Sequence, residues 1–558
     1  MEMLDCRRLT GPNLLLDRPG AVIEAALSPE EAGSAVAAWA EQARRLLDAL
    51  GWSEEATAAR LYPGGASLAI SAPIDALYAA TDVNEEAWKR AEAVLAGRPV
   101  PDPAETARRL RPEIAKEANP ALVALRDAAR DHGVSFLWDN HRATVGLGSG
   151  SRTWPVEALP DPDDLDWTGI RDIPVLLVTG TNGKTTTVRL LAAIVDASEQ
   201  MAGMTSTDRI EVGGDEIEEG DYSGPGGART LLRDRRVEVA ILETARGGLL
   251  RRGLAVEKAD AALVTNISAD HLGEYGIHDL ESLAEAKLVI TRVVGPQGRV
   301  VLNADDPVLA AAAGRISAPI VWFSLDPDHP KVRERLAAGG EAVVLEDGAV
   351  VLARGDRREP VARVEELPIT FGGAARHNVA NILAAVGMAS ALGIAPADMA
   401  RGLRRLRTGP EDNPGRMNLL ERGGVRILLD YAHNPDGLKA MLEVAGSLPA
   451  GRRLMVIGQA GDRDEAAIRE LARVAAEFPA DLFIVKDLPE MLRGRLPGEV
   501  PEILEDELRR LGVPAERLER ADSEIAAVRR ALDWARPGDL LVLLVHTQRK
   551  EILELLRA

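Results

Sequence analysis

The residues best suited to chemistry form a short loop rich in glycine, threonine and lysine. It begins at Val178, follows an apolar run and precedes a helix-like segment. Glycines let a backbone wrap closely around phosphate, and the first turn of a helix offers free N–H groups and a favourable dipole. We expect Lys184 to reach the β- and γ-phosphate oxygens and the Thr185 hydroxyl to bind Mg²⁺. The candidate nucleotide-binding residues are Gly180, Thr181, Asn182, Gly183, Lys184, Thr185 and Thr186. The alternative, a glycine turn that merely precedes a helix, leaves the Lys-Thr pair without a role.

Acidic and imidazole side chains follow two further apolar runs. Glu243 ends one run, and His271 follows the next. The carboxyl ends of parallel strands face the ligand crevice, where a carboxylate can hold Mg²⁺. A lone histidine is usually structural. However, His271, His377 and His433, among eight histidines, each lie at a predicted strand end or helix start, which favours a functional role.

The sequence also predicts the strands and helices that must position these residues. From Ile173 onward, apolar runs alternate with amphipathic segments of helical length, which is typical of a mostly parallel sheet with helices on both faces. The predicted strands are 175–179, 237–243, 261–267, 299–303 and 319–324, and the predicted helices are 184–197, 280–294 and 377–392. A second α/β unit has predicted strands 425–430, 453–457, 482–485 and 540–545, with helices 437–445, 465–477, 501–511 and 524–535.

The first part of the chain has a different pattern. Helical stretches at 28–50 and 104–131 precede a strand-like piece at 134–147, and a linker rich in proline and aspartate follows. We therefore expect an α/β protein of three domains. They are an N-terminal α+β accessory domain at 1–160, a central P-loop parallel-sheet ATPase domain at 161–410, and a Rossmann-like C-terminal domain at 411–558.

Bulk composition excludes several classes of protein. The chain has 558 residues, of which 46% are hydrophobic and 28% charged, as in globular proteins. A net charge of -20 disfavours nucleic acid as a partner. We find no apolar run long enough for a membrane span and no signal-peptide pattern. The single cysteine, Cys6, can form neither an internal disulfide nor a zinc cage, so we expect a cytoplasmic protein.

Further motifs follow the P-loop and Glu243 in a fixed order. They are Thr265-Asn266-Ile267 with Asp270-His271-Leu272, then Glu285-Ala286-Lys287, Leu302 to Pro307, Arg376 to Asn381, Asn413 to Arg416, and Asp430 to Pro435. In content and order this series resembles the Mur ligase superfamily over residues 170–550. Stretches 8–13, 221–225, 243–251 and 492–499 look like the cyanophycin synthetases, a group that also carries an ATP-grasp domain. Residues 1–160 leave no room for that domain, so we expect one kind of amide bond per active site.

The resemblance implies roles for the residues near the phosphates. Lys184 and Thr185, with Glu243, would hold the γ-phosphate and a first Mg²⁺, and His271 would bind a second Mg²⁺. For the rest of the nucleotide, the implied contacts are Asn378 with adenine, Arg416 with the phosphates and Asp430 with the ribose.

Lys287 matches a lysine that is carbamylated in this superfamily. A carbamate offers anionic oxygens to a hard cation such as Mg²⁺, which a neutral amine does not. The resemblance thus implies a carbamylated lysine in the metal site. The alternative is an ordinary exposed lysine on a helix.

Other polar residues are substrate candidates with open alternatives. Asp462, in a Gly-Asp-Arg-Asp run after a predicted strand, suits either a helix cap or an amine-binding pocket. Arg493 and Arg495 suit either carboxylate recognition or a solvated loop. Asp487 follows a strand and could pair with a cationic substrate. Arg246 and His433 complete this group.

Together, the residues and the resemblance predict an ATP-dependent, ADP-forming acid–amino-acid ligase. The enzyme would activate a carboxylate as an acyl phosphate, which an amino acid or small amine then attacks. The expected cofactors are ATP and two Mg²⁺ ions. The expected partners are amino acids or peptides, without nucleic acid or membrane, and a homo-oligomer is left open. One alternative is a cell-wall or folate-type amino-acid ligase; another is a non-catalytic nucleotide-binding partner of a separate synthetase.

Overall fold

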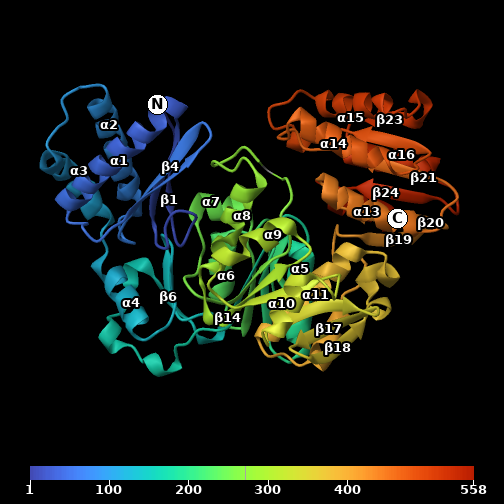
Figure 1. The fold of residues 1–558 in the computed structure, drawn as a ribbon, viewed down its shortest axis with the longest axis horizontal. Coiled ribbons are helices and arrows are strands. Elements are labelled where there is room, and N and C mark those ends of the chain that lie inside the picture. Colours follow the sequence, from blue (N-terminus) through green and yellow to red (C-terminus); the bar gives the residue numbers. More distant parts are fainter. Residues whose placement is uncertain (271, 558) are drawn as a thin grey trace. The chain divides into compact units, whose positions relative to one another are not determined.

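The computed structural model describes residues 1–270 and 272–557, and the chain divides into two compact units (Figure 1). The first unit consists of Met1–Val343, Leu352–Arg357 and Ala384–Met399. The second consists of Val344–Val351, Arg358–Leu383 and the chain from Ala400 onward. The candidate metal ligand His271 lies outside the described residues. Within them, no helix is both long and apolar enough to cross a membrane.

The first unit begins with a four-stranded antiparallel sheet in the order β1-β2-β4-β3. Its strands are β1 (Glu2–Leu9), β2 (Gly20–Ala26), β3 (Thr57–Tyr62) and β4 (Gly65–Ser71). The helices of this part are α1 (Pro29–Leu50), α2 (Leu77–Leu95), α3 (Pro103–Glu117) and α4 (Pro120–Asp131). Trp39 of α1 and Trp88 of α2 lie in the core that these helices share with the sheet. The buried Trp39 N–H donates to Asn84 Oδ1 at 2.9 Å, which satisfies this indole within the core.

Two predictions in this part need correction. The predicted helix 104–131 is two helices, because Pro120 lacks an N–H and disfavours helical geometry at the residue before it. The predicted strand 134–147 is a hairpin of β5 (Phe136–Trp138) and β6 (Arg142–Val145), joined by β7 (Arg152–Pro155) in a three-stranded sheet. Asp139 makes the turn, because its carboxylate accepts the N–H groups of His141 and Arg142.

A large, mostly parallel sheet carries the candidate nucleotide site. Its order in the first unit is β11-β10-β9-β12-β8-β13-β14-β15. The strands are β8 (Val175–Thr179), β9 (Ala202–Thr205), β10 (Arg209–Val212), β11 (Asp215–Glu219), β12 (Val239–Glu243), β13 (Ala259–Val264), β14 (Val294–Asn303) and β15 (Ile320–Ser324). The helices are α5 (Lys184–Ala197), α6 (Pro225–Leu232), α7 (Arg246–Arg252), α8 (Leu280–Leu288), α9 (Pro307–Ala312) and α10 (Pro330–Ala337). Strands β12, β8 and β13 are parallel neighbours, so their carboxyl ends, which carry the motifs, meet.

The next segment contributes residues to both units. It holds β16 (Glu341–Glu346), β17 (Ala349–Arg354), β18 (Arg357–Arg363), α11 (Arg376–Ala391) and α12 (Pro396–Leu403). These strands, like β9 to β11, were not predicted. Strand β11 is exposed along its whole length, so it lacks the apolar run by which a buried strand is recognised. The predicted helix 280–294 is also too long, because α8 ends at Leu288 and β14 begins at Val294.

The second unit contains a six-stranded sheet in the order β19-β20-β24-β21-β22-β23. Its strands are β19 (Asn418–Arg422), β20 (Val425–Asp430), β21 (Arg453–Ile457), β22 (Leu482–Lys486), β23 (Leu518–Ala521) and β24 (Leu540–Leu544). Only β19 is antiparallel to its neighbour. The helices are α13 (Pro435–Ser447), α14 (Glu465–Ala476), α15 (Glu499–Arg510), α16 (Glu524–Trp534) and α17 (Arg549–Arg557).

This second sheet is covered by helices on both faces. Along β20, Leu428 packs with α13, α14 and α15, whereas Ile427 and Leu429 pack with α16 and α17. Alternate side chains of a strand point to opposite faces, so an apolar strand requires two cores. The α/β fold with parallel sheets that the sequence predicts is confirmed.

Candidate functional site

The P-loop connects β8 to α5 through two glycines with left-handed backbone geometry. Gly180 has a φ of 145° and Gly183 a φ of 85°. A Cβ atom on Gly180 would lie 1.9 Å from Thr265 Oγ1, so no other residue fits there. The helix begins at Lys184, where the sequence predicted it. The loop therefore presents the N-terminus of a helix of 14 residues, a favourable position for phosphate.

The loop after β13 clamps the P-loop in place. Asn266 accepts the N–H of Asn182 at 2.9 Å and donates its own amide to the Asn182 carbonyl at 3.0 Å. The Thr265 hydroxyl donates to the same carbonyl at 2.6 Å. The sequence identified Thr265 and Asn266 only as part of a family motif. Their role, which is to fix the shape of the phosphate loop, is apparent only in three dimensions.

A hydroxyl and a carboxylate meet beside this loop. Thr185 Oγ1 donates to Glu243 Oε2 at 2.8 Å, and both side chains are buried. Thr207, which sequence reasoning missed, lies 3.2 Å from the same hydroxyl. Hydroxyl and carboxylate oxygens are suitable ligands for Mg²⁺, which needs only one or two protein ligands when phosphates and water supply the rest. Among the described residues no group of three or more His, Cys, Asp or Glu could hold a metal.

Two lysines converge on the backbone of the same loop. Lys184 Nζ donates to the carbonyls of Gly180 at 3.1 Å and Thr181 at 2.9 Å. Lys287 Nζ, from α8, donates to the Gly180 carbonyl at 2.7 Å. Lys287 is only 6% exposed, so the alternative of an exposed helix lysine is wrong. Burial lowers the pKa of Lys287 well below its ordinary value, and the charges of Lys184 and Arg246 lower it further.

Arg246 adds a third cationic group. It is the first residue of α7, it is 8% exposed, and its Nη2 donates to Glu274 at 2.6 Å. Its Nη1 is buried without a hydrogen-bond partner among the described residues. A buried N–H without a partner costs about 1–3 kcal/mol, more when charged, so such a group points to a missing ligand. Three cations around one loop favour an anion.

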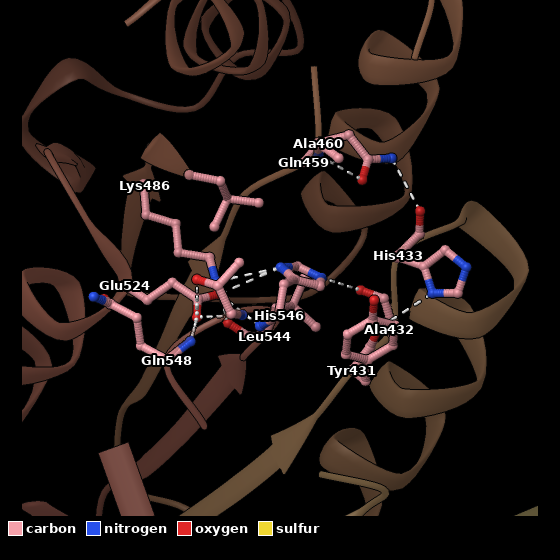
Figure 2. A network of polar contacts seen from close by, with 12 residues as sticks. Tyr431, Ala432, His433, Gln459, Ala460, Lys486, Glu524, Leu544, His546 and Gln548 are labelled. Carbon is pink, nitrogen blue, oxygen red and sulfur yellow. Dashed lines mark hydrogen bonds and ion pairs between the residues drawn. The ribbon is translucent and has the colours of Figure 1, made fainter. Parts of the chain in front are cut away.

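Three candidate residues come together in the second unit. Asp430, at the end of β20, accepts the N–H groups of Met417 and Ala432, each at 2.7 Å. Burial raises the pKa of Asp430. The Arg416 guanidinium lies 4.7 Å from the centre of the Tyr431 ring. His433 meets the same ring edge-on with the centroids 5.3 Å apart (Figure 2). Arg416, Asp430 and His433 are thus neighbours around Tyr431.

Asn378 is buried and makes contacts within the protein. Its amide donates to the Ile369 carbonyl at 2.8 Å, and its oxygen accepts from Asn381 at 3.2 Å. These two hydrogen bonds fix the orientation of Asn378.

The remaining substrate candidates lie at the loops before α14 and α15. Asp464, not Asp462, caps α14 by accepting the Ala467 N–H at 2.7 Å, and Asp462 is exposed. Arg493 is also exposed.

Arg495 and Asp487 hold these loops together. Arg495 donates to the carbonyls of Gly461 at 3.0 Å and Arg463 at 2.9 Å and pairs with Glu499. Asp487 accepts the Gly498 N–H at 2.6 Å. These contacts occupy both side chains and favour a structural role.

Comparison with known proteins defines the class to which this fold and site belong. The Mur ligase middle domain matches residues 178–389, and the Mur ligase glutamate ligase domain matches residues 415–544. The chain belongs to the Mur ligase family.

Individual relatives differ in how much of their length is matched. The chain is 41% identical over 386 residues to a cyanophycin synthetase of Synechocystis, covering 69% of this chain and 44% of that protein. It is 31% identical over 385 residues to a UDP-N-acetylmuramoyl-L-alanyl-D-glutamate–2,6-diaminopimelate ligase of Gloeobacter violaceus. The match covers 67% of this chain and 72% of that ligase. Among solved structures, E. coli FolC in complex with ADP aligns with a TM-score of 0.49 and 20% identity over 69% of this chain and 89% of that one. The chain spans less than half the length of the cyanophycin synthetase it matches.

Proposed function

We propose that this chain is an ATP-dependent, ADP-forming amide ligase. It would activate a carboxylate as an acyl phosphate, which an amino acid or small amine then attacks. The observation that carries this proposal is the 2.8 Å contact between the Thr185 hydroxyl and the Glu243 carboxylate at the phosphate loop. Membership of the Mur ligase family, with relatives named as synthetases and ligases, supports it.

Different residues of the first unit would bind the phosphates and the Mg²⁺ during phosphoryl transfer. The Gly180–Gly183 turn and the start of α5 would bind the phosphates of ATP, and Lys184 would leave its carbonyl partners for the γ-phosphate. Thr185 and Glu243 would hold Mg²⁺. Bound Mg²⁺ would neutralise the charge that develops on the transferred group. By resemblance to the family, we keep His271 as the ligand of a second ion.

Lys287 is proposed to carry a carbamate. Only the neutral amine reacts with CO₂, and burial beside Lys184 and Arg246 lowers the pKa of Lys287 and so favours that form. Conversion to an anion would also relieve the repulsion among the three cations. The carbamate oxygens would then face the Mg²⁺ site.

Arg246 is proposed to bind the carboxylate of the acceptor. Its buried Nη1 has no partner among the described residues, and it belongs to the cationic group around the P-loop. A guanidinium suits a carboxylate or the acyl phosphate formed from it.

In the second unit, Asn378, Arg416, Asp430 and His433 remain the candidates for contact with the nucleotide or the intermediate.

We also keep the division into domains at 1–160, 161–410 and 411–558, because the matched ranges fall inside the last two. A single cysteine suits a reducing compartment, and we propose the cytoplasm.

The substrates are amino acids or short peptides. A second candidate is a cell-wall type of amino-acid ligase, because the chain covers 72% of the diaminopimelate ligase of Gloeobacter violaceus. The two candidates share the acyl-phosphate chemistry and differ only in the acceptor.

The test is ADP release by the purified chain over a panel of carboxylate acceptors and amines, with mass spectrometry of any product. We expect ADP release only when both an acceptor and an amine are present. Lys184→Ala serves as the inactive control. If the protein binds ATP tightly but releases no ADP, even with a cell extract as substrate source, it is a non-catalytic nucleotide-binding protein instead.

A further inference from the structure

A buried ion pair spans the carboxyl ends of the parallel strands in the second unit (Figure 2). Lys486 is the last residue of β22, and its fully buried ammonium pairs with Glu524, the first residue of α16. The same ammonium donates to the Leu544 carbonyl of β24 at 2.5 Å. Between β22 and β24 lies β21, and a Cβ on Gly458, the residue after β21, would be 2.7 Å from Lys486 Cγ. Glycine at position 458 therefore leaves the space through which the Lys486 side chain passes the end of β21 to reach β24.

The carboxylate of Glu524 orders the turn that follows β24. It accepts the N–H groups of His546 at 2.6 Å and of Thr547 and Gln548 at 2.8 Å each. A buried ion pair is rarely more stable than a well-packed apolar pair in its place. A pair so fully hydrogen-bonded does, however, fix one geometry among its partners.

The turn presents His546 to the segment that follows β20. His546 Nε2 lies 3.0 Å from the Ala432 carbonyl, which can only accept, so Nε2 carries the proton and donates. Nδ1 then accepts from the Lys486 ammonium, 3.4 Å away, while a Glu524 carboxylate oxygen lies 3.5 Å from the same nitrogen. Burial lowers the pKa of His546, which keeps the ring neutral in this tautomer. The Ala432 carbonyl and the Lys486 ammonium thus both favour the tautomer in which Nε2 donates.

Ala432 lies at the centre of the candidate site of the second unit. Its N–H is held by Asp430, and the next carbonyl, of His433, accepts from Gln459 Nε2 at 3.0 Å (Figure 2). The Tyr431 ring lies edge-on to His546, with centroids 5.4 Å apart, and carries the Arg416 guanidinium on its face. The hydrogen bond from His546 therefore connects the buried pair to the backbone between Tyr431 and His433.

We propose that Lys486, Glu524 and His546 are positioning residues that hold the segment Asp430–His433, so that Arg416 and His433 face their ligand. That this ligand is a nucleotide rests on the proposed function. The positioning itself does not, because it concerns only contacts within the second unit.

Two variants of His546 separate positioning from packing. Glutamine can place an N–H near the position of Nε2 and donate to Ala432, whereas leucine of similar size cannot. We expect His546→Leu to speed amide hydrogen exchange in residues 430–434 about tenfold, the effect of losing one hydrogen bond, and His546→Gln to leave it within about threefold of wild type. Binding of a fluorescent ADP analogue should weaken in the same order. The midpoint of thermal unfolding should stay near wild type in both variants.

The proposal is overturned if the leucine variant exchanges at the wild-type rate in residues 430–434, or if its exchange rises equally throughout the second unit. It is equally overturned if His546→Gln speeds exchange in residues 430–434 as much as His546→Leu does. Glu524→Gln removes the charge but keeps an acceptor for the turn. Its rate of amide hydrogen exchange in residues 430–434 should lie between the rates of the two His546 variants. A wild-type protein that binds no ADP analogue would refute the proposed function, while hydrogen exchange would still decide the positioning role.

Discussion

The Lys287 ammonium lies 2.7 Å from the carbonyl oxygen of Gly180, although the two residues are 107 positions apart in the chain. This contact brings a buried lysine of α8 to the backbone of the phosphate loop. Burial is the main cause of the lowered pKa of Lys287; the charges of Lys184 and Arg246 lower it further, and the Asp270 carboxylate opposes them. The contact therefore joins the phosphate site and the proposed carbamate site into one centre.

Lys287 should accept CO₂ reversibly. With ¹³C-bicarbonate at neutral pH, we expect one carbamate signal in the ¹³C NMR spectrum that is absent from Lys287→Ala and present in Lys89→Ala, which removes an exposed helix lysine. Lys287→Ala should lose ADP release and regain part of it when a short carboxylate such as acetate is added. An unchanged spectrum in Lys287→Ala would show that the carbamate lies elsewhere.

Lys184→Ala should reduce ADP release by at least about 10²–10³-fold, because the lysine would stabilise charge on the transferred phosphoryl group. The thermal unfolding midpoint should change little, since the side chain donates to two carbonyls of its own loop. Steady-state assays and calorimetry test this together. Near-normal turnover would mean that the phosphate site has been wrongly assigned.

Arg246→Met should raise the KM for the carboxylate acceptor roughly 10–100-fold, the loss of a hydrogen bond to a charged group, with a smaller effect on the KM for ATP. Arg315→Met, at an exposed arginine of the first unit, is the control and should leave both constants unchanged. An equal rise of both constants in Arg246→Met would argue for a role in the fold of α7 rather than in acceptor binding.

The chain should bind one nucleotide and form one kind of amide bond. Its sequence has one P-loop, and we find no second nucleotide motif in it. Isothermal titration with a non-hydrolysable ATP analogue should give one site per chain. Incubation with aspartate, arginine and ATP should yield no Asp-Arg polymer. A second bound nucleotide within residues 1–160, or the polymer itself, would contradict this.

Cys6 should be almost unreactive in the folded protein. Burial raises the pKa of its thiol to about 12, and the charges of Glu85 and Asp5 add to the effect. Only the thiolate attacks a disulfide reagent, so at pH 8 the folded protein should react at least about a hundredfold more slowly than in urea. Raising the pH towards 12 should increase the rate in the folded protein. A rapid reaction at pH 8 without urea would show that β1 is not packed as described.

Features that depend on neighbours in sequence could be predicted from the sequence. The turn from Gly180 to Gly183 and the start of α5 at Lys184 are local, because glycine geometry and helix initiation involve residues a few positions apart. Strands β20 and β21 were predicted with the observed bounds, since a buried parallel strand is a continuous apolar run. Each family motif is likewise a short stretch of neighbouring residues, so the motifs and their order could be identified from the sequence.

The tertiary structure alone decided which of these residues meet. Thr185 reaches Glu243 across 58 positions, and Lys486 reaches Glu524 across 38, because the order of strands in each sheet brings particular strand ends together. It likewise showed that Arg495 and Asp487 join loops, whereas the sequence left contact with a substrate open for both. Hydrogen bonds between distant residues depend on strand order and burial. Neither can be predicted from the local spacing of residues in the chain.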